Sequence, residues 1–291
     1  MPTTYTAFTK LPSKDQAEAL GLALEDMDPE PTGIGVFEIE DGSGTWEVGG
    51  YFIDTPNDVE LAILAAAYGA QPFVVSEVPD TDWVDKVRRE LTPVEAGRFF
   101  VYGSHDADKV PEGSVPLLIE AAMAFGTGHH GTTQGCLEAL DRLAEQGFVG
   151  ESVADIGCGT AVLAMGAASI WPNPVMASDI DEVAVEVAEA NVSANNLSGK
   201  VTCVEAAGFG NAALTEAAPY DLIFANILKQ PLIDLSPDMA ANLQSGGYAI
   251  LSGILTRQAD EVVEVYARNG INQLRRDVIG DWVTLTLQKS A

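Results

Sequence analysis

The hydrophobic and polar positions of the first residues predict a helix followed by a pair of strands. An amphipathic segment from about Ser13 to Leu24 is typical of a helix with one buried face. Two alternating segments, residues 34–40 and 45–53, follow it and predict strands. The sequence Asp41-Gly42-Ser43-Gly44 lies between them and is a strong turn signal, so the two strands are expected to form a hairpin.

A second helix and a closing strand complete this first unit. Asn57 is placed to cap a helix that runs from Val59 to Tyr68, and Gly69 ends it. Residues 72–75 then begin the last strand. The order helix, strand, strand, helix, strand predicts that residues 1–78 form a small α+β ferredoxin-like domain.

The next segment is charged and predicts a linker over residues 79–105. It contains a short predicted helix from Trp83 to Glu90 and a β segment around Arg98 to Tyr102. His105 at its end is expected to lie at the surface. The remaining residues, 106–291, are then predicted to form one larger domain.

From Ser152 onward, short apolar segments alternate with longer helical segments, which is typical of a doubly wound parallel α/β sheet. The last two segments follow the final helix almost back to back, so the sheet should end in a hairpin. The seven predicted strands are residues 153–156, 175–178, 201–204, 222–225, 248–252, 272–279 and 282–287.

Charge and composition narrow the choice of partner. The chain has 291 residues, of which 47% are hydrophobic, and a formal net charge of −28. Residues 1–60 hold 13 Asp or Glu against Lys10 and Lys14. Because phosphate binding needs a basic surface, direct nucleic-acid binding is disfavoured. The acidity either steers a basic macromolecule to the protein or serves only solvation.

The first residues, the lengths of the apolar runs and the cysteines favour an intracellular protein without a disulfide framework. The first residues lack a basic segment followed by an apolar one, and no apolar run is long enough to span a membrane, so we expect a cytoplasmic protein that binds no membrane. Cys136, Cys158 and Cys203 are odd in number and lack metal-ligand spacing. We expect buried free thiols and no metal site.

The strongest local signal is Asp155-Ile156-Gly157-Cys158-Gly159-Thr160-Ala161, at a strand-to-helix turn. Gly157 and Gly159 would let the backbone approach a ligand closely, which indicates a nucleotide-type pocket, although a glycine turn without a ligand is the alternative. A dinucleotide fingerprint needs a small residue where this chain has Val162, which disfavours hydride transfer. Asp155 instead suits a ligand with an ammonium group, such as S-adenosylmethionine.

Two further strand ends carry polar residues. Asp179 ends the second strand, 22 residues after Gly157, where its carboxylate could accept both ribose hydroxyls. We interpret its neighbour Asp181 as the N-cap of the next helix. Asn226 ends the fourth strand, where its carbonyl could accept a hydrogen bond from an amine and act on a methyl acceptor. It could equally be the N-cap of a helix from Ile227 onward.

These segments together resemble the PrmA methyltransferases, which trimethylate amino groups of the large-subunit ribosomal protein eleven. The resemblance covers nearly the whole chain. The seven strands predicted here, ending in a hairpin, match the way in which a class I methyltransferase sheet closes. The matching segments are residues 91–94, residues 124–133 against the family pattern AFGTGxHxTT, the glycine loop, residues 178–181, residues 225–228, residues 251–255 and residues 258–260.

The resemblance implies a class I methyltransferase domain, doubly wound and Rossmann-like, behind a small domain that holds the protein substrate. It implies S-adenosylmethionine as cofactor and methylation of lysine and N-terminal amino groups of a ribosomal protein. Apart from the resemblance, we expect a monomer. The implied cofactor contacts are Thr133, Gly157, Asp179 and Asn226, with Phe125, Gly126, Thr127 and Thr132 lining the pocket beside Asp155 and Gly159.

Two departures from the family pattern concern the same pocket. Ala161 replaces a usual third glycine, and His129 occupies a variable position while His130 falls on the family histidine. We expect His130 to shape the pocket rather than to act as a base.

Three alternatives stay open. Glutamine-modifying methyltransferases carry Asn-Pro-Pro-Tyr after the fourth strand, whereas this chain has Asn226-Ile227-Leu228-Lys229. A methyltransferase with another acceptor is therefore the nearest alternative. An NAD-dependent oxidoreductase and a noncatalytic acidic binding module are the others.

Overall fold

The computed structural model describes residues 4–24, 27–31, 33–39, 44–78, 93–119 and 131–290. They divide between two units, Met1–Lys86 and Val87–Ala291. Each unit is held by hydrophobic clusters of its own.

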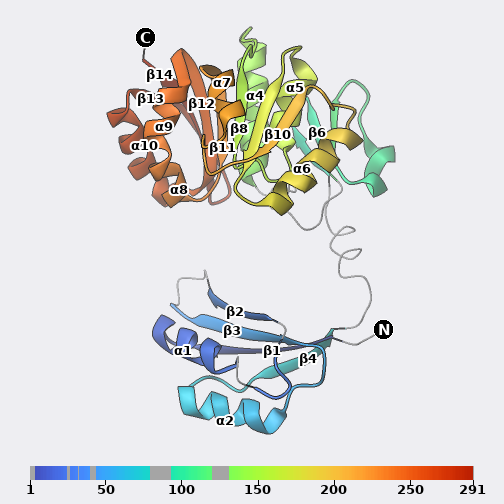
Figure 1. Ribbon diagram of the computed structural model, residues 1–291, viewed down its shortest axis with the longest axis vertical. Coiled ribbons are helices and arrows are strands. Elements are labelled where there is room, and N and C mark those ends of the chain that lie inside the picture. The colour runs from blue at the N-terminus through green and yellow to red at the C-terminus, as the bar shows by residue number, and fades with distance from the viewer. Residues whose placement is uncertain are drawn as a thin grey trace. The chain divides into compact units, whose positions relative to one another are not determined.

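The first unit is a four-stranded antiparallel sheet with two helices (Figure 1). The strands lie in the order β2-β3-β1-β4, which with the chain order βαββαβ is the ferredoxin-like arrangement. Its elements are β1 (Thr4–Leu11), α1 (Lys14–Leu24), β2 (Gly33–Glu38), β3 (Trp46–Phe52), α2 (Asp58–Tyr68) and β4 (Val74–Val78).

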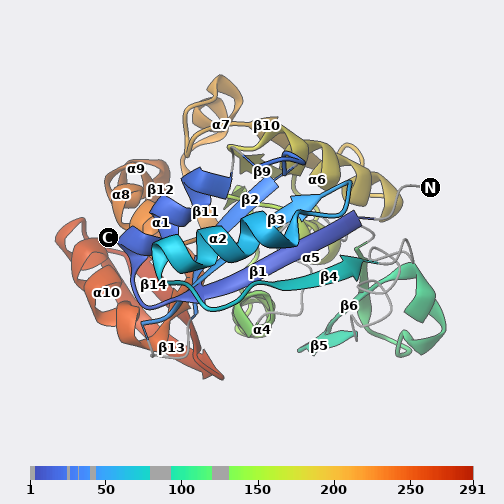
Figure 2. The same ribbon diagram turned by 90° about the horizontal axis from the view of Figure 1, so that it is seen from below.

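Both helices cover the same face of this sheet, as Figure 2 shows. Leu20 and Leu24 of α1 are buried in one cluster with Val48 and Phe52 of β3. The predicted cap of α2 is confirmed, because the Asn57 side chain accepts hydrogen bonds from the backbone of Val59 and Glu60 and Gly69 closes the helix with φ 70°. The predicted turn at residues 41–44 lies mostly outside the described residues.

The pattern analysis missed strand β1, which lies in the interior of the sheet between β3 and β4. Two of its core-facing positions are Ala7 and Thr9, which are fully buried or nearly so. The Thr9 hydroxyl donates to the Gln71 carbonyl oxygen (2.5 Å). Small and polar side chains at buried positions weaken the apolar alternation by which a strand is recognised.

The second unit is built on a seven-stranded sheet in the order β10-β9-β8-β11-β12-β14-β13. The first five strands of this order are parallel, and β14 pairs antiparallel with both β12 and β13. The strands are β8 (Val153–Ile156), β9 (Val175–Asp179), β10 (Val201–Glu205), β11 (Tyr220–Asn226), β12 (Leu243–Leu255), β13 (Ile271–Ile279) and β14 (Trp282–Lys289). All seven predicted strands and the closing hairpin are therefore confirmed.

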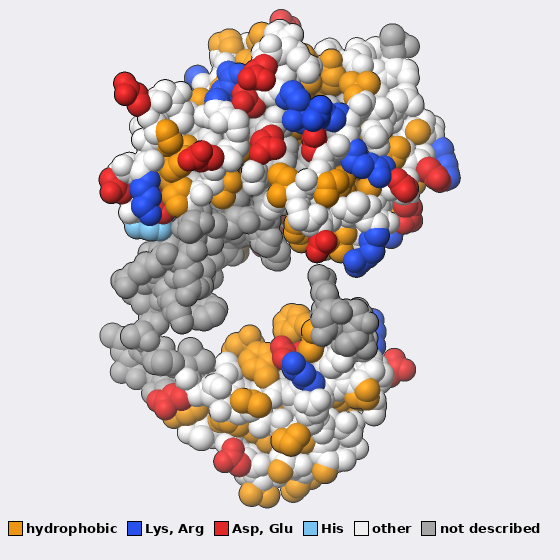
Figure 3. All heavy atoms as spheres, turned by 180° about the vertical axis from the view of Figure 1, so that it is seen from behind, with side chains coloured by type: hydrophobic (Ala, Val, Ile, Leu, Met, Phe, Trp, Pro, Cys, Tyr) orange, Lys and Arg blue, Asp and Glu red, His pale blue; other side chains and the backbone are white. Residues whose placement is uncertain are grey.

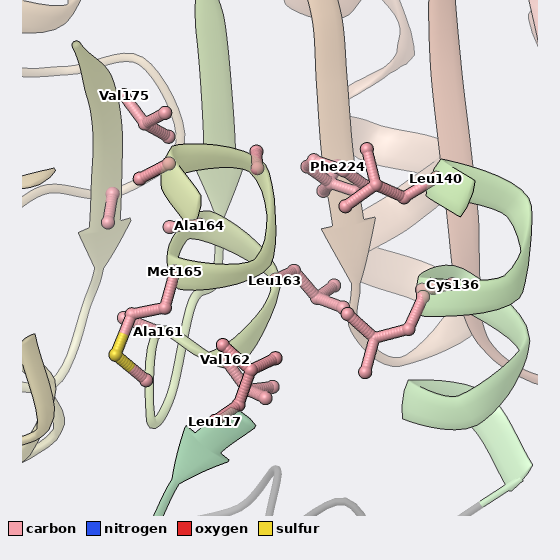
Figure 4. Packing of buried hydrophobic residues seen from close by; sticks show 14 of the residues in the cluster. Leu117, Cys136, Leu140, Ala161, Val162, Leu163, Ala164, Met165, Val175 and Phe224 are labelled. Carbon is pink, nitrogen blue, oxygen red and sulfur yellow. The ribbon is translucent and has the colours of Figure 1, made fainter. Parts of the chain in front are cut away.

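Helices cover both faces of this sheet, as predicted for a doubly wound fold. One face packs against α4, α5 and α6, and the other against α7 to α10. In Figure 4, Leu163 of α5 lies between that helix and Cys136 and Leu140 of α4. The helices are α4 (Gly131–Glu145), α5 (Val162–Ile170), α6 (Glu182–Ala194), α7 (Ala212–Ala217), α8 (Lys229–Asp234), α9 (Ser236–Asn242) and α10 (Ala259–Arg268).

A small three-stranded sheet precedes the large one in the second unit. It consists of β5 (Val94–Ala96), β6 (Phe99–Tyr102) and β7 (Val115–Leu118), with a short 3-10 helix (Ser104–Lys109) between the last two. Phe99 and Leu117 are buried in the same cluster as Leu137 of α4. The structure thus places residues 94–102 in the second unit, where we had expected a linker up to residue 105.

The face of the second unit in Figure 3 carries basic and acidic side chains close to one another. Among the described residues of this unit, Arg142 forms an ion pair with Asp277, and Arg276 forms one with Asp260. No helix in the described part of the chain is both long and apolar enough to cross a membrane.

Candidate functional site

The ends of three strands bring predicted site residues to the same edge of the large sheet. The strand order places β8 between β9 and β11, and all three strands are parallel. Their carboxyl ends therefore deliver the glycine loop after β8 between Asp179 of β9 and Asn226 of β11. In open α/β sheets this edge is where ligands bind.

The glycine loop has the backbone conformation that its sequence predicts. Gly157 and Gly159 have φ values of 74° and 52°, in the left-handed region. The amide groups of Gly157 and Cys158 both donate to the Ser178 carbonyl oxygen, at 2.7 and 2.9 Å. Ala161 also has a positive φ of 60°, which explains why a glycine is suited to that position.

Asp179 is tied to the glycine loop by its own carboxylate. Its Oδ2 accepts from the Gly159 amide (2.9 Å), and its Oδ1 accepts from the Asp181 amide (3.1 Å). A carboxylate has about four acceptor positions, so two remain for a ligand. Asp181 caps α6 by accepting from the Val183 amide (2.9 Å), as predicted.

Asp155 is a buried carboxyl group with an unsatisfied oxygen. Its Oδ2 accepts from the Ala164 amide (3.1 Å), whereas its Oδ1 has no partner among the described residues. Burial, and to a smaller degree the charge of Asp179, raises the pKa of Asp155 to about 7. An ammonium group placed here would satisfy the free oxygen and favour the charged carboxylate.

Asn226 is linked to helix α4 by a hydrogen bond. Its Nδ2 donates to Oγ1 of Thr133 across a distance of 3.4 Å. Thr133 lies in the first turn of α4 and is 1% exposed. The alternative role of Asn226 as a helix cap is wrong, because α8 begins at Lys229 and its N-cap is Leu228.

The remaining predicted residues are placed as follows. Thr132 is buried beside Thr133 at the start of α4. The three cysteines are free; Cys136 and Cys158 are buried as expected, whereas Cys203 is partly exposed, and burial raises the pKa of each thiol, which favours its protonated form. Phe125, Gly126, Thr127, His129 and His130 lie outside the described residues.

Two asparagines that the sequence analysis missed connect α6 to this site. Asn191 is buried, and its Nδ2 donates to the carbonyl oxygen of Thr160 in the glycine loop (3.2 Å). Asn195 accepts from the Leu118 amide and donates to the Leu118 carbonyl, both at 2.8 Å. Their spacing of four residues, which puts both amides on one helix face, was the available signal.

Two features define a class I methyltransferase. The first is the strand order with its antiparallel seventh strand, and the second is the glycine loop between the polar ends of β9 and β11. Comparison with known proteins refines this class. The model of the family described as ribosomal protein L11 methyltransferase (PrmA) matches residues 13–290. The chain belongs to this family.

Individual relatives agree with the family match. Proteins named ribosomal protein L11 methyltransferase from Mesorhizobium japonicum and Rhizobium etli are 42% and 40% identical to the chain over 273 and 279 residues. These alignments cover 93% of this chain and 93% of the first relative, and 94% and 95% for the second. A crystal structure of a ribosomal protein L11 methylase from Lactobacillus delbrueckii subsp. bulgaricus superposes with a TM-score of 0.60 and 25% identity, covering 69% of this chain and all of that one.

Proposed function

We propose that the protein transfers methyl groups from S-adenosylmethionine to lysine and N-terminal amino groups of ribosomal protein L11. Family membership over almost the whole chain supports the reaction and the substrate. The observation that carries the proposal in the structure is the glycine loop with Asp179 on one side and Asn226 on the other. We place the reaction in the cytoplasm, where ribosomal proteins are made.

The residues at this edge suit S-adenosylmethionine. Asp155 offers a buried oxygen without a partner, which an ammonium group would satisfy. Asp179 keeps acceptor capacity for ribose hydroxyls. Gly159 has a left-handed backbone and no side chain, so a ligand can approach the loop backbone closely at this position. Thr132 and Thr133, with residues 125–127, would line the same pocket.

Asn226 is the residue that we assign to the acceptor side, and Thr133 of the cofactor pocket is its hydrogen-bond partner. When bound, the cofactor supplies a methyl group that its positive sulfonium has already activated, so no strong base is required. The bond from Asn226 Nδ2 to Thr133 orients the amide. The Asn226 carbonyl oxygen can then accept a hydrogen bond from the incoming amine without adding a charge.

The acceptor amine must be neutral to attack. A lysine side chain has an ordinary pKa of about 10.4, and an apolar pocket lowers it because the charged form is poorly solvated there. The protein therefore has to desolvate the lysine and hold its nitrogen in line with the methyl group. Positioning of this kind is a large part of catalysis in two-substrate reactions.

We assign recognition of the protein substrate to the first unit. It has its own core, and its described strands and helices hold none of the predicted cofactor residues. Its dense acidity suits a ribosomal protein, because proteins that bind RNA carry basic surfaces. The protein is expected to work as a monomer without contacting nucleic acid or membrane.

The test is methyl transfer to purified, unmodified L11, followed by mass spectrometry of the modified residues. Wild-type enzyme should add methyl groups to lysine and N-terminal amines. Asn226→Ala should lower kcat about tenfold or more, because the acceptor loses its orienting group, while calorimetry shows little change in cofactor affinity.

Asn242→Ala is the matched control for this variant. Asn242 is remote in sequence from the predicted site residues and donates only to the Asp238 carbonyl within its own helix, so kcat should be retained. Transfer to other proteins but not to L11 would refute the substrate. A collapse of cofactor binding in Asn226→Ala, with turnover per bound cofactor unchanged, would refute the role of Asn226.

A further inference from the structure

The residue that follows Asn226 is enclosed by two glycines from other parts of the chain. On one side lies Gly157 of the glycine loop, where an added Cβ would overlap with Cγ2 of Ile227. On the other side lies Gly253 of β12, where an added Cβ would come within 2.7 Å of both the backbone N and C of Ile227, and closer still to its carbonyl oxygen. Ile227 therefore packs directly against backbone on both sides.

Gly253 belongs to a bulge in β12. Leu251 pairs with Leu285 and Ile254 with Val283, so β12 uses one residue more than β14 across this stretch. The Ser252 hydroxyl, which is fully buried, donates to the Val283 carbonyl (2.8 Å) and lies 3.1 Å from the Thr284 hydroxyl. These bonds hold the bulge in place on its β14 side.

The same bulge reaches β11 on its other side. Ser252 pairs with Asn226 in the parallel ladder, and the Ile227 amide donates to the Ser252 carbonyl (3.2 Å). Gly253 has a φ of 83°, so the chain turns there in a conformation that side chains disfavour. Two interactions thus join the end of β11 to the bulge. One is the hydrogen bond from Ile227 to Ser252, and the other is the direct contact of the Ile227 backbone with Gly253, which has no side chain.

We propose that Gly253 is a positioning residue for the methyl transfer. The absence of a side chain at 253 sets how closely the Ile227 backbone approaches β12, and the position of Ile227 sets that of the Asn226 amide beside Thr133. This inference rests on the proposed role of Asn226 toward the acceptor. Gly253 itself does not touch the reactants, and its effect passes through Asn226.

A side chain at 253 would shift rigid atoms. The atoms in its way belong to the backbone of Ile227, whereas at Gly157 the overlapping atom is the end of a side chain. Rotation of a side chain therefore cannot relieve the overlap at 253. The end of β11 must move instead, and a displacement of about 1 Å near a reacting group can cost about 100-fold in rate.

The same strand offers a matched control. Gly246 also lies in β12 and has a φ of 77°, but an added Cβ there would meet no atom within 4 Å. Gly246→Ala therefore imposes the same kind of backbone strain as Gly253→Ala without the contact. Any difference in kcat between the two variants therefore measures the effect of the contact with Ile227.

The experiment measures kcat for L11 and the calorimetric affinity for S-adenosylmethionine in the full-length protein. Gly253→Ala should lower kcat about 10- to 100-fold and change cofactor affinity much less, whereas Gly246→Ala should keep kcat close to that of the wild type. The decisive readout is a double-mutant cycle with Asn226→Ala. If Gly253 acts through Asn226, Gly253→Ala should lower kcat by less than about twofold once Asn226 is already replaced.

Two outcomes overturn the inference: a wild-type kcat in Gly253→Ala, or a loss that multiplies fully with that of Asn226→Ala. If Gly253→Ala does not fold, Ser252→Ala replaces it, since it loosens the bulge without adding atoms. Ser252→Ala should then lower kcat on its own but cause little further loss of kcat in a chain that already carries Asn226→Ala. A full further loss in the double variant, or no loss of kcat in Ser252→Ala alone, overturns the inference. An unchanged kcat in Asn226→Ala alone refutes the proposed role of that residue and removes the basis of the inference.

Discussion

The carboxylate of Asp179 accepts hydrogen bonds from Gly159 and from Asp181, so it orders the glycine loop for which we propose a role in cofactor binding. Its replacement should weaken cofactor binding. Hydrogen bonds to a charged group contribute about 1.5 to 3 kcal/mol, so Asp179→Ala should lower affinity for S-adenosylmethionine about 10- to 100-fold in calorimetry.

Asp181→Ala is the control for this prediction. It removes the N-cap bond to Val183 two residues away and should cost about 1 kcal/mol of stability while leaving cofactor affinity unchanged. If the two variants bind the cofactor equally well, Asp179 has no direct part in binding.

If Asp155 binds the cofactor's ammonium group as we propose, cofactor binding should depend on pH. Its pKa is raised to about 7 by burial, so the free enzyme holds it protonated below that pH. Because the bound ammonium group favours the ionised carboxylate, affinity should fall by up to about tenfold for each pH unit below 7. Calorimetry between pH 6 and pH 8, on the order of one unit either side of the pKa, checks this.

Asp155→Asn keeps the shape of the side chain but cannot ionise, so its affinity should lose this pH dependence. The stability of the unliganded enzyme provides a second check. The pKa of Asp155 in the folded enzyme lies above the ordinary value of about 3.9. The contribution of Asp155 to folding stability is therefore complete below about pH 4 and is lost as the pH rises to about 7. A wild-type stability profile identical to that of Asp155→Asn would contradict the assignment.

At the scale of elements, α6 connects the glycine loop to strand β7. The Asn195 amide makes the same pair of hydrogen bonds to Leu118 that a neighbouring strand would make, and Asn191 holds Thr160. The two amides thus tie the glycine loop and the end of β7 to α6 and its C-terminal cap.

Asn195→Ala should leave the Leu118 amide and carbonyl without these partners. Unsatisfied polar groups of this kind cost about 1 to 3 kcal/mol, so chemical denaturation should show a loss of stability in that range. A control at the exposed end of α10, Arg268→Ala, removes only a surface ion pair with Glu264 and should change stability by less than about 1 kcal/mol. Equal losses in both variants would show that the link from α6 to β7 contributes little.

At the scale of the whole molecule, the two units divide the proposed work. The two hydrophobic clusters of the second unit contain no residue before Val94, as far as the described residues go, so this unit is held by its own core. A chain that begins at Val87 should therefore fold, bind S-adenosylmethionine with unchanged affinity, and methylate a short lysine peptide.

The same shortened chain should fail to methylate intact L11, because it lacks the unit that we assign to substrate recognition. The measurement is kcat/KM on intact L11 relative to the lysine peptide, for the full-length and shortened chains. Full activity of the shortened chain on intact L11 would refute the assignment of recognition to the first unit.

The local features of this protein can be predicted from its amino-acid sequence alone. Alternation of apolar segments gave all seven strands of the large sheet, and residue types with strong backbone preferences gave the glycine loop and the caps at Asn57 and Asp181. The positions of Asp155, Asp179 and Asn226 at strand ends followed from the same pattern. These features are predictable because each depends on neighbours within a few residues along the chain.

Only the tertiary structure decided which distant residues meet. Thr133 and Asn226 are 93 residues apart in sequence, and no local pattern reveals that they share a hydrogen bond. The same holds for strand β1 in the interior of its sheet, for β5 to β7 in the second unit, and for Gly253 against Ile227. Strand pairing and close backbone packing depend on shape and burial across the whole fold, which the residue types of one segment do not specify.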